Sequence, residues 1–126
     1  DIEATQHLID SIYHSELLIS VITTLGLDAV IFDKPQIILA FDGYEKRPFL
    51  KSVRRFHQED NMKGFIDTGA VRIVNNPKDL IYQINQYLEK PDTDKGGREK
   101  ARRDILFKTD GKSGERIADS VLEFIK

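Results

Sequence analysis

The sequence of 126 residues contains no cysteine, no tryptophan and only one methionine. Without cysteine the chain can form neither a disulfide nor a thiolate-ligated metal site, a composition typical of reducing compartments. Its apolar runs are short, and none approaches the ~20 residues that a helix needs to span a bilayer. No signal peptide is visible. From these absences we expect a cytoplasmic protein with an ordinary hydrophobic core.

The chain also has no excess of either charge. Its 19 basic and 21 acidic residues give a formal net charge of −2, so the composition offers no general case for nucleic-acid binding. A hydrophobic content of 40% is enough for one folded domain with a real core. His7 and His14 would lie two turns apart on a helix, too far for one ion. We therefore expect neither a metal site nor a cofactor.

Residues 16–38 have the pattern of a βαβ unit. Residues 17–21 form a short apolar run with β-branched side chains, which is typical of a strand covered on both faces. Residues 25–32 are mostly apolar and predict a buried helix, which Pro35 cannot continue. The apolar segment 37–41 predicts the next strand.

The turn between the first strand and the helix is the candidate binding site. Ligands of open α/β sheets bind at the carboxyl ends of strands, where the free N–H groups and the dipole of a helix start favour an anion. Thr23 and Thr24 suit that helix start, and Gly26 lets another backbone or a ligand approach closely. Asp28 follows Thr24 by one helical turn, about 6 Å further along the axis. A diphosphate at the threonines would therefore place an attached ribose near the Asp28 carboxylate.

A simpler interpretation fits the same residues. Thr23 and Thr24 would only cap the helix, and Asp28 would form an ion pair with a lysine or arginine. Both interpretations predict the same secondary structure, and residue types alone favour the simpler one, since helix caps are far commoner than ligand sites.

The remainder of the chain predicts a third strand at residues 71–74 and further helices. Asn76 and Pro77 are typical of a helix start, as cap and first residue. The helices are expected where apolar residues recur at helical spacing, at 4–13, 78–88, 98–107 and 117–125.

Two segments after the second strand are of interest for binding. Residues 42–48 form a turn-rich loop at that strand's carboxyl end, where α/β sheets build their sites. Residues 49–56 are basic and amphipathic, which favours a solvated helix face, with contact to an anionic acceptor or a membrane face as the alternatives.

Near the end of the chain, Gly-Lys-Ser at 111–113 invites comparison with a P-loop. The first glycine of that motif would be residue 106, which is leucine, and no strand precedes it. Ser113 is instead expected to cap the last helix. The apolar side chains of that helix are then expected to pack inward, namely Ile117, Val121, Phe124 and Ile125.

Three segments of the chain resemble the C-terminal nucleotide-sugar-binding domain of GT-B glycosyltransferases, which are built from two Rossmann-like domains. They are HSELLISVITTLGLDAVIFDKPQIIL at 14–39, GAVRIV before a proline-led helix at 69–74, and KTDGKSGERIADSVLEFI at 108–125. Within that group the chain is most similar to bacterial surface-polysaccharide enzymes and to relatives of CDP-glycerol glycerophosphotransferase.

The resemblance implies a site and its ligands. The nucleotide diphosphate would lie at Thr23, Thr24 and Gly26, and the ribose at Asp28, where related enzymes often have glutamate. The segment from Ser113 to Arg116 would approach the same phosphates, although a surface ion pair is an equal alternative for the arginine. The donor would be a nucleotide-activated sugar or glycerol, and the acceptor a polysaccharide or a lipid-linked molecule. The whole enzyme would work in the cytoplasm, with peripheral association at the inner face of the cell membrane.

By the same resemblance, residues 1–126 form one Rossmann-like domain, the C-terminal part of a larger two-domain enzyme. Only three strands can be predicted, whereas a Rossmann-like half has about five or six. Asp1 is not an initiator residue, so we expect the missing strands and an N-terminal domain upstream. The general base of such enzymes normally comes from the other domain, so we assign no catalytic residue here and expect no turnover by this chain alone.

Two further hypotheses stay open. The chain could be a non-catalytic α/β interaction module, such as a receiver-like domain. A receiver would need acidic residues where the first strand ends, and this sequence has Ile22, Thr23 and Thr24 there. A UDP-sugar 2-epimerase-like domain shares the architecture but is less similar in the last segment.

Overall fold

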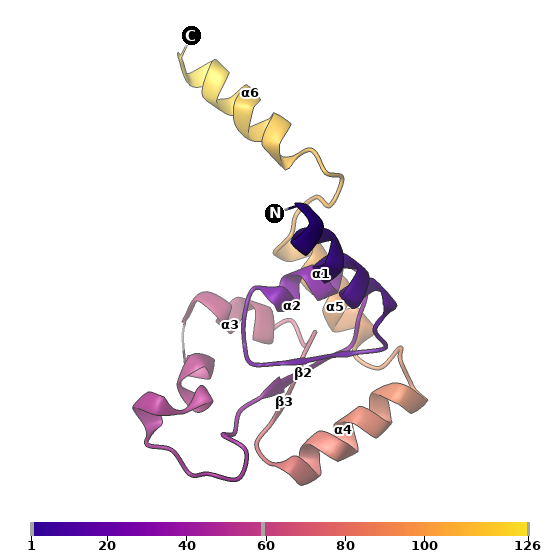
Figure 1. Cartoon of the computed structure of the whole chain (residues 1–126). Coiled ribbons are helices and arrows are strands. Elements are labelled where there is room, and N and C mark those ends of the chain that lie inside the picture. Colours follow the sequence, from indigo (N-terminus) through magenta and orange to yellow (C-terminus); the bar gives the residue numbers. More distant parts are fainter. Residues whose placement is uncertain (1, 59, 126) are drawn as a thin grey trace.

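The computed structural model describes residues 2–58 and 60–125. The chain is mixed α/β, as predicted, with a small parallel sheet and helices on both of its faces (Figure 1). No helix in the described ranges has both the length and the apolar character needed to cross a bilayer. The elements in chain order are α1 Ile2–His14, β1 Leu18–Ser20, α2 Leu25–Ile31, β2 Gln36–Leu39, η1 Phe49–Lys51, η2 Val53–Gln58, α3 Asp60–Ile66, β3 Arg72–Val74, α4 Pro77–Glu89, α5 Lys95–Asp104 and α6 Ser113–Ile125.

The sheet has the order β1-β2-β3, and both pairs of strands are parallel. Strand β2 lies in the middle, and Ile37 and Ile38 are almost completely buried on its two faces. Strand β1 lies at an edge, where Ile19 is 40% exposed. The expectation that the first strand is covered on both faces is therefore wrong. The reason is that α4 packs on β2 and β3 and leaves β1 open on that side.

The two faces of the sheet have separate cores. On one face Ile38 of β2 packs with Val30 of α2, Phe65 of α3 and Ala101 of α5. On the other face Ile37 packs with residues of β3 and α4, among them Tyr87. In Figure 1 these layers are visible as α2 and α5 above the strands and α4 below them. Helix layers on both faces are what a parallel sheet requires, because its crossover connections run along them.

Helix α4 begins as the sequence predicts. Asn76 is its cap, with its side-chain oxygen accepting a 2.9 Å hydrogen bond from the Asp79 amide, and Pro77 is its first residue. Its apolar stripe is narrower than expected, because Ile81 and Leu88 are exposed. Tyr87 is the residue of this stripe that is fully buried.

A polar network joins α4 to the segment before α5. The Tyr87 hydroxyl donates to the Asp94 carboxylate at 2.7 Å, and Arg72 of β3 binds both that carboxylate and Gln83. Burial raises the pKa of the Tyr87 phenol, and the hydrogen bond to Asp94 adds to this effect. The network therefore fixes β3, α4 and the α4–α5 connection relative to one another.

Helix α5 is anchored by an arginine whose burial the sequence did not predict. The Arg98 side chain is 1% exposed, and its Nε donates to Asp33 at 2.7 Å. Its two other nitrogens donate to the carbonyls of Pro91 and Thr93. One turn later Arg102 donates to the Val30 and Ile31 carbonyls at the end of α2. A buried guanidinium needs such partners to offset its lost hydration, so these hydrogen bonds favour the observed position of α5.

Two glycines allow close approach between elements. At Gly26 an added Cβ would meet the Gln36 side chain at 2.8 Å and the Phe65 ring at 2.9 Å. At Gly97 an added Cβ would overlap the backbone carbonyl of Gly69. Helix α5 therefore lies against the Gly69 backbone at a distance that no larger residue permits, and a larger residue at Gly26 would displace the Gln36 and Phe65 side chains.

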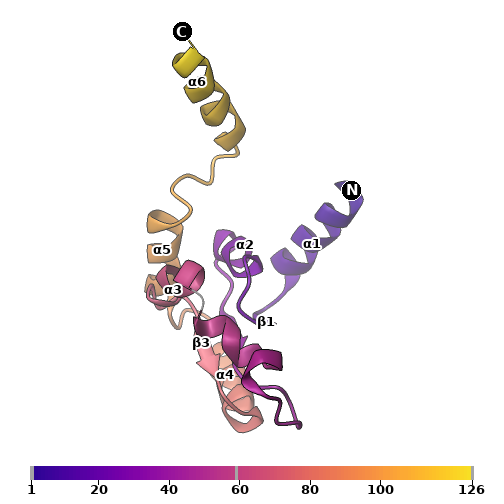
Figure 2. The same cartoon turned by 90° about the vertical axis from the view of Figure 1, so that its left-hand side faces the viewer.

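Helix α6 differs from the expectation. It extends away from the sheet and its helical layers, as both views in Figures 1 and 2 show. Its apolar side chains do not pack inward, and the prediction that they do is wrong. The connector after α5 leads the helix beyond reach of the sheet, so its apolar residues are exposed, namely Ile117 65%, Val121 51%, Leu122 59%, Phe124 93% and Ile125 73%.

The adjacent glycines of α5 provide a matched test of this packing. Gly97→Ala should lower the free energy of unfolding by about 1–3 kcal/mol, because the new methyl group displaces the Gly69 backbone. Gly96→Ala has open space around it and should raise stability by about 0.5–1 kcal/mol through helix propensity. Urea unfolding of both variants followed by circular dichroism measures the difference. Equal midpoints for the two variants would contradict the close approach at Gly97.

Candidate functional site

All three strands are parallel, so their carboxyl ends meet at one edge of the sheet. At the end of β1 the chain turns into α2 through Thr23 and Thr24, both of which are exposed. Thr24 holds the cap position of α2, but its side chain makes no capping hydrogen bond. The simpler interpretation of Thr24 as a side-chain cap is therefore wrong.

Gly26 does not face solvent with the threonines. It is buried against Gln36 and Phe65, and its carbonyl accepts a 2.9 Å hydrogen bond from Nε2 of the Gln36 side chain. Its own N–H donates to the Thr23 carbonyl at 3.1 Å. A ligand at this turn would therefore meet the threonines, while Gly26 positions the turn by letting α2 pack closely.

Asp28 is exposed, and none of the described residues forms an ion pair with it. It stands at an apolar groove of about 250 Å³ between α1 and α2. The groove is lined by Thr5, Leu8, Ile9, Ile12, Asp28, Ile31 and Phe32. The Asp28 carboxylate is thus open to a ligand. The alternative that it forms an ion pair is not supported by the described residues.

Ser113 and Arg116 lie in another part of the molecule. Both belong to α6, which extends away from α2 (Figures 1 and 2). Arg116 binds the Asp110 carboxylate with two nitrogens, at 2.9 and 3.0 Å. Ser113 is the first residue of α6 and accepts a 3.4 Å hydrogen bond from Arg116. The structure therefore does not bring these two residues to the threonine turn, and the alternative of a surface ion pair for Arg116 is confirmed.

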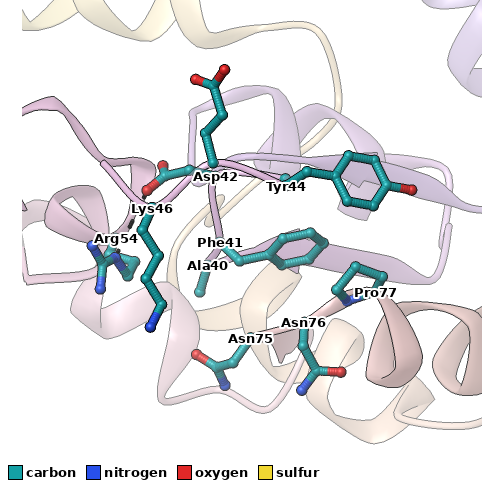
Figure 3. A pocket seen from close by; sticks show the side chains of 11 residues that line it. Ala40, Phe41, Asp42, Tyr44, Lys46, Arg54, Asn75, Asn76 and Pro77 are labelled. Carbon is teal, nitrogen blue, oxygen red and sulfur yellow. Dashed lines mark ion pairs between the residues drawn. The ribbon is translucent and has the colours of Figure 1, made fainter. Parts of the chain in front are cut away.

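A larger cavity, of about 490 Å³, opens at the carboxyl ends of β2 and β3. Figure 3 shows side chains from the loop after β2 and from the β3–α4 turn converging around it. The sequence indicated that the loop after β2 contributes to a binding site, but it gave no reason to include the β3–α4 turn in that site. The parallel pairing of β2 with β3 is the signal that adds it. The lining residues are Ala40, Phe41, Asp42, Gly43, Tyr44, Glu45, Lys46, Arg54, Asn75, Asn76 and Pro77.

Asp42 organises the wall of this cavity. Its side chain is 5% exposed, and Oδ1 accepts a 2.8 Å hydrogen bond from the Val53 amide. Oδ2 lies 3.9 Å from Nε of Arg54, which in turn donates to the Ser52 hydroxyl at 2.8 Å. The hydrogen bond with Ser52 lowers the pKa of the Asp42 carboxyl, and the Val53 amide and Arg54 lower it further. The ionised carboxylate therefore ties η2 back to the end of β2.

One charged side chain that lines the cavity is outside the ion pairs of the described residues, and it is basic. Lys46 has no ion pair with a described residue, and it lies beside Arg54 in Figure 3. Among the described residues no group of three or more histidine, aspartate or glutamate side chains is placed to hold a metal ion. Since Asp42 is already bound on both oxygens, the cavity has the character of a binding surface more than that of an acid–base centre.

Titration of Asp42 should be visible at the Val53 amide. Because the folded pKa is lower than the ordinary 3.8, the carboxylate stabilises the loop at higher pH and loses this effect as pH falls below 3.8. The Val53 amide proton should shift upfield by NMR with a midpoint below 3.8. Asp42→Asn should remove the transition and speed trypsin cleavage at residues 46–55. Glu45→Gln, which changes an exposed neighbour, should do neither. A midpoint at or above 3.8 would contradict the assigned hydrogen bonds.

The ion pair of α6 gives an independent prediction. The Arg116 guanidinium holds the pKa of Asp110 at about 2. The pair therefore contributes above the ordinary pKa of 3.8 and is lost as pH falls towards 2. Carboxyl ¹³C NMR should give a midpoint of about 2 for Asp110, and Arg116→Gln should return it towards 3.8. An unchanged midpoint in that variant would show that Arg116 does not bind Asp110.

Comparison of the chain with protein-family models, with curated proteins and with solved structures found no match.

Proposed function

We propose that the chain is the donor-nucleotide-binding part of a glycosyltransferase or glycerophosphotransferase of bacterial surface-polysaccharide synthesis. The observation that carries the proposal is the exposed Thr23-Thr24 turn at the carboxyl end of β1, in a parallel α/β sheet. Open α/β sheets bind ligands at the carboxyl ends of their strands. The sequence patterns around this turn and in the last segment of the chain support the same assignment.

In the proposed site the diphosphate contacts the hydroxyls of Thr23 and Thr24, and the ribose contacts Asp28. Helix α2 has seven residues, and the amides of Gly26 and Leu27 already donate to carbonyls of the turn. The threonine hydroxyls therefore supply more of the phosphate contact than the helix start does. The site in this form does not need Ser113 or Arg116.

The proposed reaction is an inverting transfer. An acceptor hydroxyl attacks the activated carbon or phosphorus of the donor, and the nucleotide leaves with its phosphate. This chain would orient the donor and stabilise the leaving group. The base that takes the acceptor proton would come from a second domain across the cleft. We therefore expect binding without turnover from the chain alone.

Nucleotide titration tests the proposal. Addition of UDP, CDP or GDP to the ¹⁵N-labelled chain should shift the amides of Thr23 and Thr24 and those around Asp28. Inorganic pyrophosphate should shift only the threonine turn. Asp28→Ala should weaken nucleotide binding by about tenfold, because a charge-assisted hydrogen bond to the ribose is lost. The same variant should leave pyrophosphate binding unchanged.

Asp119→Ala is the matched control, since Asp119 is another exposed helical aspartate, on α6. It should bind nucleotide as the unmodified chain does. The proposal fails if a folded chain shows no shifts at the threonine turn, or if both aspartate variants weaken binding equally.

A second candidate function is a non-catalytic interaction module. The exposed apolar side chains of α6 favour it, because a contiguous apolar surface of this kind commonly marks a protein contact. A folded chain that binds none of UDP, CDP and GDP would favour this candidate.

A further inference from the structure

The segment after β2 carries a surface that the nucleotide site does not use. Here it is called the basic–apolar patch. Its apolar members are exposed, Tyr44 by 102%, Leu50 by 77% and Phe49 by 45%. None of these three side chains belongs to either of the two buried core clusters. The patch consists of Tyr44, Lys46, Arg47, Phe49, Leu50, Lys51, Arg54 and Arg55.

The patch is built on an ordered backbone. Nη2 of Arg54 donates to the Arg47 carbonyl at 2.8 Å, and Nη1 of Arg55 donates to the Leu50 carbonyl at 2.9 Å. These bonds fold the loop and η1 against η2, and Asp42 ties the whole unit to β2. Figures 1 and 2 show the unit at the periphery of the molecule, remote from α6. The protruding side chains are therefore presented on a fixed support.

Charge separates this unit from the rest of the molecule. Residues 42–56 contain five basic and two acidic residues, although the whole chain has a formal net charge of −2. One of the two acids, Asp42, is buried in its hydrogen bonds to the loop. The unit therefore has a formal net charge of +3, whereas the remaining residues of the sequence together have −5.

We propose that the basic–apolar patch docks on the surface of an anionic lipid bilayer. Its cations would lie among the lipid phosphates, and Tyr44, Phe49 and Leu50 would enter the interface between headgroups and acyl chains. A soluble polyanion would use the cations but would leave the apolar side chains in water. The protruding apolar residues therefore favour a bilayer.

Docking would also orient the molecule. Tyr44, Lys46 and Arg54 belong both to the patch and to the lining of the cavity at the ends of β2 and β3. A bilayer bound at the patch would thus face the carboxyl edge of the sheet. If the proposed transferase function holds, this places the donor site next to a lipid-linked acceptor, but the docking itself does not depend on that function.

Vesicle sedimentation of the full chain tests the proposal. The chain should bind vesicles that contain phosphatidylglycerol and not vesicles of phosphatidylcholine alone, and added salt should weaken binding. Lys46→Gln combined with Lys51→Gln should lower the partition coefficient by roughly 25-fold, at about fivefold for each cation. The matched control, Lys90→Gln with Lys100→Gln, removes two exposed lysines elsewhere and should change it less than about threefold.

A second pair of substitutions distinguishes a bilayer from a soluble polyanion. Tyr44→Ser with Leu50→Ser should lower vesicle binding at least about fivefold, while binding to soluble polyphosphate stays the same. Circular dichroism confirms that each variant is folded. The proposal is overturned if the chain does not bind anionic vesicles, if the control pair matters as much as the patch pair, or if the serine variant binds vesicles as the unmodified chain does. Nucleotide titration is a separate measurement, so failure of one proposal is distinguishable from failure of the other.

Discussion

The parallel pairing of β2 with strands on both sides is the constraint on which the rest of the structure depends. Because β2 is central, its residues are covered by α2, α3 and α5 on one face and by α4 on the other. Because both pairs are parallel, the ends of β1, β2 and β3 open onto a single edge. The threonine turn, the cavity and the basic–apolar patch all follow from that arrangement.

Helix α5 holds the arrangement together from outside the sheet. Gly97 lets it lie against the turn before β3. Arg98 binds the Asp33 carboxylate and Arg102 binds the Val30 carbonyl, and each of these contacts joins residues more than 60 positions apart in the sequence. A guanidinium is suited to this role because its donors are rigidly arranged and satisfy several acceptors at once. The sequence of α5 is strongly polar, so its composition does not indicate that the helix has a structural role.

The carboxyl edge combines two features of different chemistry. At β1 the surface is polar and uncharged, with the Asp28 carboxylate beyond it. At β2 and β3 the surface is basic and apolar, and Asp42 maintains it through bonds to Ser52 and Val53. A nucleotide donor at the end of β1 and an anionic lipid surface at the ends of β2 and β3 would occupy neighbouring parts of the same edge. They would not compete for the same residues.

The sequence by itself determined most of the local elements, because strand and helix periodicity and the Asn76-Pro77 helix start depend on nearby residues only, but it did not predict α3. It also predicted the exposed threonine turn, since a strand followed by two threonines and a glycine limits what the backbone can do. Tertiary structure alone decided which of these elements share a surface. The burial of Arg98, the exposure of Ile19 at an edge strand, the separation of Arg116 from Thr23 and the cavity between two strand ends all depend on contacts between distant segments. Periodicity cannot reveal such contacts, because it records which face of an element is apolar but not what lies against it.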